Sequence, residues 1–138
     1  MKVYAVIDTN VLVSALLTRN HYSATYMILE SLLERKIKIL YNDDILKEYK
    51  EVLSRPKFHL PKDDVNNIIN FVVEEGLLSK RKHSKELFPD PKDVVFYEVA
   101  ISKENAYLVT GNEKHFPNKP IVVTPAEMLE ILNREGLS

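Results

Sequence analysis

Four acidic residues, Asp8, Glu48, Asp90 and Asp93, are spaced so that their side chains could act on one substrate. Asp8 directly follows the apolar run 3–7, which is typical of a strand buried on both faces. Glu48 falls in the helix expected after the second strand, and Asp90 and Asp93 open the helix expected after the third. In a parallel sheet the carboxyl ends of the strands and the starts of the following helices share one edge. We therefore expect these carboxylates to meet in one cleft.

Carboxylates that converge on one cleft point to a bound cation. Like charges repel, so such a cluster is stable only with a compensating cation or with raised pKa values. Oxygen ligands select Mg²⁺ or Mn²⁺ over zinc. Ions held in this way, with open coordination positions, can bind a phosphodiester, activate a water and stabilise the leaving oxygen. The pattern predicts metal-dependent phosphodiester hydrolysis. Asn112, after the fourth expected strand, reaches the same edge but brings no charge.

Most of these residues also have a purely structural interpretation. The sequence from Asp90 to Asp93, with Pro91 between them, is equally the pattern of a capped helix start. Glu48 lies about 100° from the centre of its helix's apolar face, a border position open to solvent. Asp8 is the exception, because Asp has low strand propensity and incurs a desolvation penalty beside a buried strand.

The elements that must position these residues alternate between strands and helices. Strands are expected at 3–7, 37–41, 106–109 and 121–123, with a weak one at 77–78. Helices are expected at 23–36, at 43–55, from a cap at Asp63 or Asp64 to Gly76, from Asp90 to about Lys103, and from Pro125 onward. This alternation predicts an α/β fold with a mainly parallel sheet of four to five strands covered on both faces.

The composition restricts the class of protein. The 138 residues fit a single domain, 1–138, and the absence of Cys excludes disulfides and thiolate metal sites. A net charge of −1 argues against holding nucleic acid by bulk electrostatics, so a polyanion would need a local basic patch or bound cations. No apolar stretch approaches the roughly 20 residues that span a bilayer, and no signal-peptide pattern is present. We expect a cytoplasmic protein without a membrane partner.

Four segments together resemble a known family. They are Val6–Leu16, Ile45–Tyr49 followed by Leu53–Phe58, Asp90–Asp93 followed by Ala100, and Leu108–Asn112. In their order and spacing they resemble the PIN domain family, and within it the small prokaryotic toxins of toxin-antitoxin pairs. The resemblance implies a three-layer α/β/α sandwich and an endoribonuclease that uses Mg²⁺ or Mn²⁺ to hydrolyse single-stranded RNA. It also implies an antitoxin protein as partner and a homodimer.

The resemblance assigns roles by position. Asp8, Glu48 and Asp93 match the core catalytic and metal-binding acids, Asp90 a possible additional metal ligand, and Asn10 and Thr110 supporting polar residues. Many family members carry a fourth Asp where this chain has Asn112, whose amide offers one carbonyl oxygen and no charge. A second metal should then bind weakly, or not at all without substrate. The alternative is a PIN scaffold with weakened catalysis that serves as an RNA- or protein-binding module.

Two further hypotheses are open at this stage. A strand that ends in Asp also opens phosphatases that form an aspartyl-phosphate, although these carry a second acid where this chain has Asn10. Four residues could flank the cleft, because loops that follow strands end at the predicted edge: Arg55, Lys57 and Lys114 as RNA contacts, and His115. The only dense basic run, Lys80–Lys85, could also contact phosphates, although a solvated loop is the simpler explanation.

Overall fold

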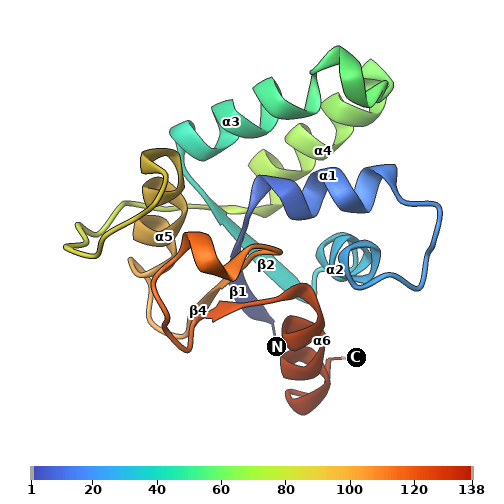
Figure 1. Ribbon diagram of the computed structural model, residues 1–138. Coiled ribbons are helices and arrows are strands. Elements are labelled where there is room, and N and C mark those ends of the chain that lie inside the picture. The colour runs from blue at the N-terminus through green and yellow to red at the C-terminus, as the bar shows by residue number, and fades with distance from the viewer. Residues whose placement is uncertain (1, 138) are drawn as a thin grey trace.

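The structure is a computed structural model that describes residues 2–137. Five parallel strands form one sheet in the order β3-β2-β1-β4-β5 (Figure 1). They are β1 (Val3–Ile7), β2 (Ile37–Tyr41), β3 (Leu77–Leu78), β4 (Ala106–Val109) and β5 (Val122–Val123). β1 lies in the middle, where Val3 pairs with Ile37 of β2 and Ile7 pairs with Val109 of β4. The predicted parallel sheet is confirmed.

Helices cover both faces of this sheet. They are α1 (Thr9–Leu17), α2 (Ala24–Leu33), α3 (Asp43–Leu53), α4 (Lys62–Glu75), α5 (Val94–Ala100) and α6 (Pro125–Arg134). Short 3₁₀ turns occur at Pro56–Phe58, Pro91–Asp93 and Glu113–His115. In Figure 1, α5 lies on one side of the sheet while α1, α2 and α6 lie on the other. The expected three-layer α/β/α arrangement is therefore confirmed, and no helix within residues 2–137 is long and apolar enough to cross a membrane.

The core forms where the strands meet the apolar faces of these helices. Ile7, Ile39 and Leu108 of the three central strands are at most 1% exposed. α3 shows how the sequence directs a helix onto this core. The Asn42 side chain accepts a hydrogen bond from the Ile45 N–H at 2.9 Å and so caps the helix, while acidic residues in the first turn suit the helix dipole. Tyr49 on the inner face of α3 is fully buried.

Two of the helix boundaries that differ from the sequence prediction have a plain structural reason. The helix expected through about Lys103 ends at Ala100, followed by a turn in which Asn105 adopts a left-handed conformation with φ of 62°. The expected cap at Asp63 or Asp64 was wrong, because Pro61 takes the cap position and both acids lie in the first turn. The predicted end at Gly76 is confirmed. A Cβ atom there would lie 2.3 Å from the Val72 carbonyl oxygen, so no larger residue fits.

A buried hydrogen bond connects α3 to the end of β1. The Tyr49 hydroxyl donates to the Ile7 carbonyl oxygen at 2.5 Å. Changing Tyr49 to Phe removes the donor and leaves a buried carbonyl without it, so we expect the free energy of unfolding to fall by about 1–2 kcal/mol. Urea unfolding followed by circular dichroism measures this loss. Tyr22, which is 90% exposed, is the matched control, and Tyr22→Phe should change stability by less than about 0.5 kcal/mol. Equal effects of the two substitutions would contradict the assignment.

Candidate active site

The carboxyl edge of the sheet borders an open cleft of ≈ 640 Å³. The structure brings the four acids singled out above to this cleft: Asp8 at the end of β1, Glu48 from α3, and Asp90 and Asp93 from the turn before α5. The cleft is also lined by Thr9, Asn10, Asp44, Lys47, Glu51, Val52, Arg55 and Lys92. The cleft is thus acidic at its centre and carries three basic side chains.

Asp8 is held by contacts from the end of the neighbouring strand β4. Its side chain is buried, with the residue 6% exposed, and its N–H donates to the Val109 carbonyl oxygen at 2.9 Å. The fully buried Thr110 donates its hydroxyl to Asp8 Oδ2 at 2.8 Å. Burial raises the pKa of Asp8, and the Thr110 hydroxyl and the N–H groups of Thr9 and Asn10 oppose that rise. The carboxylate is therefore fixed in position and only partly stabilised in its charged form.

Glu48, the second acid, is held by a hydrogen bond from the start of α1. The Thr9 hydroxyl donates to Glu48 Oε2, so the residue directly after Asp8 positions the second acid. Glu48 is half-buried, in agreement with its border position on the helix. Burial raises its pKa, the Thr9 hydrogen bond lowers it, and the negative charge of Asp8 raises it again. Sequence reasoning missed Thr9, although its position beside Asp8 was a usable signal.

The structure separates the two interpretations of Asp90 and Asp93. Asp90 Oδ1 accepts a hydrogen bond from the Lys92 N–H at 2.9 Å, so Asp90 caps the 3₁₀ turn. Asp93 makes no capping hydrogen bond, and its Oδ2 is buried without a hydrogen-bond partner among residues 2–137. Burial and the charges of Asp8 and Asp90 raise the pKa of Asp93 to about 6. Asp93 therefore has a buried oxygen that no hydrogen bond satisfies, whereas Asp90 caps the turn.

Asn112 belongs to a polar chain that ends at Asp93. Its N–H donates to the Thr110 hydroxyl oxygen at 3.0 Å, and its Nδ2 lies 3.0 Å from His115 Nε2. His115 Nδ1 in turn lies 3.3 Å from Asp93 Oδ2, beyond good hydrogen-bond geometry but close enough for an ion pair. With the amide as donor to Nε2, a neutral ring carries its proton on Nδ1, facing Asp93.

The basic residues proposed for RNA contact lie in different places. Arg55 lines the cleft and forms an ion pair with Glu51 at 3.0 Å. Lys57 lies over the Phe58 ring, 5.1 Å from its centroid, and Lys114 borders a separate hollow. Neither Lys57 nor Lys114 is among the residues that line the acidic cleft. Lys47 and Lys92, which sequence reasoning did not single out, do line it.

The acidic cleft suits a divalent cation by its donor atoms. No group of three or more His, Cys, Asp or Glu side chains within residues 2–137 is arranged to hold a metal ion as it stands. The donors are nevertheless all oxygens, which suits Mg²⁺ or Mn²⁺. Asp93 Oδ2 has no hydrogen-bond partner, and the pKa values of Asp8, Glu48 and Asp93 are all raised. These are the features of a site that lacks positive charge.

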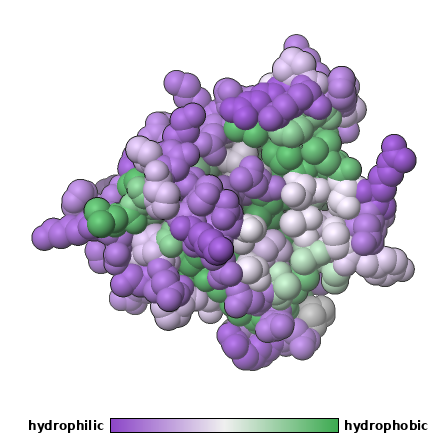
Figure 2. Space-filling view, in the orientation of Figure 1, coloured by the Kyte–Doolittle hydropathy of each residue, from purple (hydrophilic) through white to green (hydrophobic). Residues whose placement is uncertain are grey.

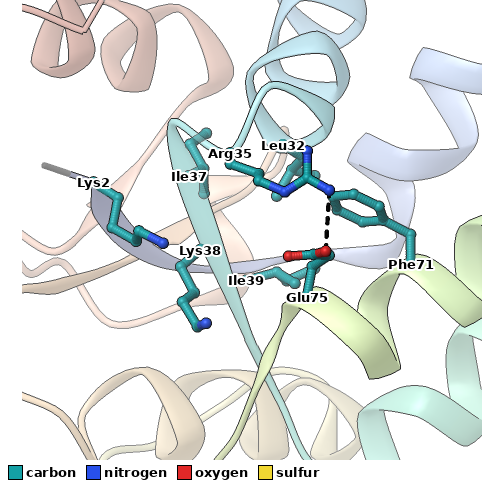
Figure 3. Close-up of a pocket in the computed structure, with 8 residues that line it drawn as sticks. All are labelled: Lys2, Leu32, Arg35, Ile37, Lys38, Ile39, Phe71 and Glu75. Atoms are coloured by element: carbon teal, nitrogen blue, oxygen red, sulfur yellow. Dashed lines mark hydrogen bonds and ion pairs between the residues drawn. The ribbon is translucent and has the colours of Figure 1, made fainter.

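A second group of charged side chains lies near the amino ends of β1 and β2 (Figure 3). Lys2, Arg35 and Lys38 contribute positive charge there, and Glu75 forms an ion pair with Arg35 at 3.0 Å. The pocket between them is only ≈ 10 Å³ and contains a single carboxylate. It therefore has neither the space nor the acidic cluster of the cleft at the opposite edge.

Comparison with known proteins agrees with this fold and cleft. The model of the PIN domain family matches residues 4–114, and the chain therefore belongs to that family of nucleases. A chain in the crystal structure of VapBC2 from Rickettsia felis, bound to a DNA fragment from their promoter, is similar in fold. The two share 21% sequence identity with a TM-score of 0.55, over 88% of this chain and 96% of that one. No curated protein matches the chain significantly.

The uncompensated acids make the stability of the metal-free protein depend on pH. Because the pKa of Asp93 rises from 3.8 to about 6 on folding, the folded state holds a proton that the unfolded state loses between these values. The stability that Asp93 contributes should therefore fall as the pH rises from 4 to 6. The shift corresponds to about 3 kcal/mol, and screening by solvent in the open cleft should reduce this to about 1–2 kcal/mol.

Urea unfolding in EDTA at pH 4, 5, 6 and 7 measures this dependence. Asp93→Asn should flatten it and raise the stability of the metal-free protein at pH 7, because the substitution removes one of the repelling charges. Asp63→Asn, at an exposed position in the first turn of α4, is the control that loses an equal charge. A stability difference between the parent and Asp93→Asn that stays constant from pH 4 to 6 would contradict the assignment.

Proposed function

We propose that this protein is an endoribonuclease that hydrolyses phosphodiester bonds of single-stranded RNA with Mg²⁺ or Mn²⁺, and that it is the toxin of a toxin-antitoxin pair. The observation that carries the proposal is the cluster of Asp8, Glu48 and Asp93 in one cleft of a PIN domain. The pKa values of these three acids are raised, and Asp93 Oδ2 is buried without a hydrogen-bond partner among residues 2–137. A phosphodiester is the substrate that such a charge arrangement, filled by a cation, recognises.

The acids divide into ligands and supporting groups. Asp8, Glu48 and Asp93 would hold the ion, with Asp90 as an additional acid at the rim. When bound, Mg²⁺ or Mn²⁺ polarises the phosphodiester and lowers the pKa of water. Thr110 fixes the direction of Asp8, and Thr9 fixes that of Glu48. These hydroxyls reduce the reorganisation that the carboxylates need when a cation arrives, which is the contribution expected of groups behind metal ligands.

The basic side chains at the cleft provide the first contacts for RNA. Lys47, Arg55 and Lys92 line it together with the acids, so the negative strand meets positive charge before it reaches the carboxylates. Lys92 also lowers the pKa of Glu48, which shows that its charge acts inside the cleft. Phosphate contacts of this kind position a strand without reading its bases.

The proposed antitoxin would bind through an apolar surface. Figure 2 shows an apolar area over α1, within a largely hydrophilic face. Leu17 of α1 is 44% exposed and Met27 of α2 is 39% exposed. The structural neighbour comes from the VapBC2 assembly bound to promoter DNA, which supports a partner protein for this chain as well. A homodimer stays a prediction.

A second candidate function follows from Asn112. If the missing charge prevents metal binding, the chain is a PIN scaffold that binds RNA or protein without cutting it. The observation in its favour is that no group of acids within residues 2–137 is already arranged around a metal position. Calorimetric titration with Mn²⁺ separates the two functions, because the binding module should take up no metal at millimolar concentration even with RNA present.

The nuclease proposal predicts metal-dependent cleavage that depends on Asp8. We expect the parent protein to cleave a single-stranded RNA with Mn²⁺ or Mg²⁺ and to be inactive in EDTA. Asp8→Asn keeps the shape of the side chain but removes a ligand charge, and it should lower the cleavage rate by roughly 100-fold or more. Asp63→Asn, outside the cleft, should retain the parent rate. Equal rates for the parent and Asp8→Asn would refute the assignment.

Asn112 gives the proposal a test in the opposite direction. Asn112→Asp adds a carboxylate at the cleft edge and replaces the amide donor to His115, so Mn²⁺ should bind more tightly, by roughly 10-fold. Calorimetry with Mn²⁺ measures this change, and cleavage should rise with it at low metal concentration. Asn118→Asp adds the same charge on the loop before β5, beside a separate hollow, and is the matched control. Unchanged Mn²⁺ affinity in Asn112→Asp would show that this position does not face the ion.

A further inference from the structure

The basic run singled out in the sequence lies in a long segment without regular structure, residues 79–89, which we call the arm. It connects β3 to the turn before α5 and projects beyond α5 in Figure 1. Lys80, Lys82, His83 and Lys85 are all exposed. A solvated loop of this length would be expected to have few fixed contacts. The arm instead has several, and they centre on one buried acid.

That acid is Glu98 of α5, which is only 6% exposed. Arg81 donates from Nε to Glu98 Oε1 at 2.9 Å and also approaches it through Nη2 at 2.8 Å. The Ser84 N–H donates to Glu98 Oε2 at 2.8 Å, and the Lys82 N–H donates to the Glu98 carbonyl oxygen at 3.0 Å. Burial alone raises the pKa of Glu98, but these bonds outweigh it and the pKa is lowered, so the side chain is a carboxylate at neutral pH.

Both ends of the arm are fastened as well. The Ser79 N–H donates to the Tyr41 carbonyl oxygen at 2.8 Å, and Glu86 forms an ion pair with Lys119 at 3.0 Å. Phe88 packs edge-on against Tyr97, with ring centroids 5.6 Å apart. The stretch between these anchors is bound to Glu98. The exposed lysines therefore project from a backbone with a defined position.

The arm reaches the rim of the acidic cleft through Arg81. Its Nη1 lies 3.6 Å from Asp44 Oδ2, and Asp44 lines the cleft. Because Arg81 is occupied by Glu98 and Asp44, its charge is neutralised locally, whereas Lys80, Lys82 and Lys85 keep theirs for a ligand. The chain as a whole has a net charge of −1, so this is a local basic surface beside an acidic site.

We propose that the arm is a docking surface for the phosphates of a single-stranded RNA outside the cleft, and that Glu98 is the positioning residue that holds it there. The inference rests on the proposed ribonuclease function and extends it to the part of the strand that is not cut. Charge complementarity identifies the occupant, since a row of fixed lysines next to a phosphodiester site fits a polyanion. A negative residue thereby strengthens the binding of a negative ligand.

The test is a binding measurement in which no cleavage takes place. We would titrate a fluorescein-labelled 20-nucleotide oligouridylate into the protein in EDTA and follow anisotropy between 25 and 200 mM salt. Lys82→Gln/Lys85→Gln should reduce the slope of log K against log salt by about 1.4 and weaken binding roughly 10- to 30-fold at 100 mM salt, since each single-strand phosphate contact contributes about 0.7 to the slope. Lys2→Gln/Lys38→Gln, at the pocket of Figure 3, removes the same charge and should leave both quantities unchanged.

Glu98→Gln provides the sharper test. If only net charge mattered, loss of an acid would tighten RNA binding, and Glu104→Gln at an exposed position measures that effect. We expect Glu98→Gln to weaken binding instead and to lower the salt slope, because the arm detaches. Trypsin should then cut Glu98→Gln faster than the parent within Lys80–Lys85. Tighter binding in Glu98→Gln, equal to that in Glu104→Gln, would overturn the positioning role.

The outcomes separate this inference from the proposed function. If the parent cleaves RNA but Lys82→Gln/Lys85→Gln binds the oligonucleotide like Lys2→Gln/Lys38→Gln, the arm is not a docking surface although the nuclease stands. If the parent does not cleave but the lysine and Glu98 variants weaken binding as predicted, the arm is a docking surface and the nuclease proposal is wrong. A parent that binds no RNA at 25 mM salt overturns the arm.

Discussion

The position of β1 between β2 and β4 is the constraint on which the site depends. Its residues pair with both neighbours, and the next N–H, that of Asp8, continues the ladder by donating to Val109 at 2.9 Å. A carboxylate placed immediately after such a strand cannot move away from its neighbours. Tyr49 then joins α3 to Ile7, the last residue of β1, and so brings Glu48 to a fixed place beside Asp8. The geometry of the acids follows from the packing of a buried strand.

The same packing makes the site electrostatically unfavourable. Burial raises the pKa values of Asp8, Glu48 and Asp93, and repulsion by neighbouring acids raises those of Glu48 and Asp93 further, whereas Thr110 and Thr9 supply only neutral hydrogen bonds. Neutral donors orient a carboxylate without cancelling its charge. His115 lies 3.3 Å from Asp93 and lowers its pKa without cancelling the rise, and Lys47, Arg55 and Lys92 line the cleft around the cluster. The arrangement is consistent with a site whose excess negative charge a bound cation would neutralise.

Sequence reasoning succeeded where the signal was local. The apolar run before Asp8 and the alternation of strands and helices define the sheet, because burial on both faces leaves a readable pattern. Asp90 and Asp93 could not be separated, since a cap and a ligand have the same local sequence, and only the long-range approach of His115 and Asp8 distinguishes Asp93. The contact between Glu98 and the arm could not be predicted either, because 14 residues separate Glu98 from Ser84. Contacts between distant segments leave no periodicity to read.

The neutral residue at position 112 fits this balance of charge. An aspartate there would add a further negative charge near Asp93, whose pKa is already raised to about 6. Asn112 instead holds His115 through its amide, and His115 is the group that lowers the pKa of Asp93. The chain therefore lacks a carboxylate ligand at position 112, and the Asn112–His115 pair in its place partly compensates the charge of Asp93. This arrangement favours the stability of the metal-free protein at the expense of metal affinity. Because the Asn112 amide holds the His115 imidazole, a change at either residue should alter the environment of Asp93.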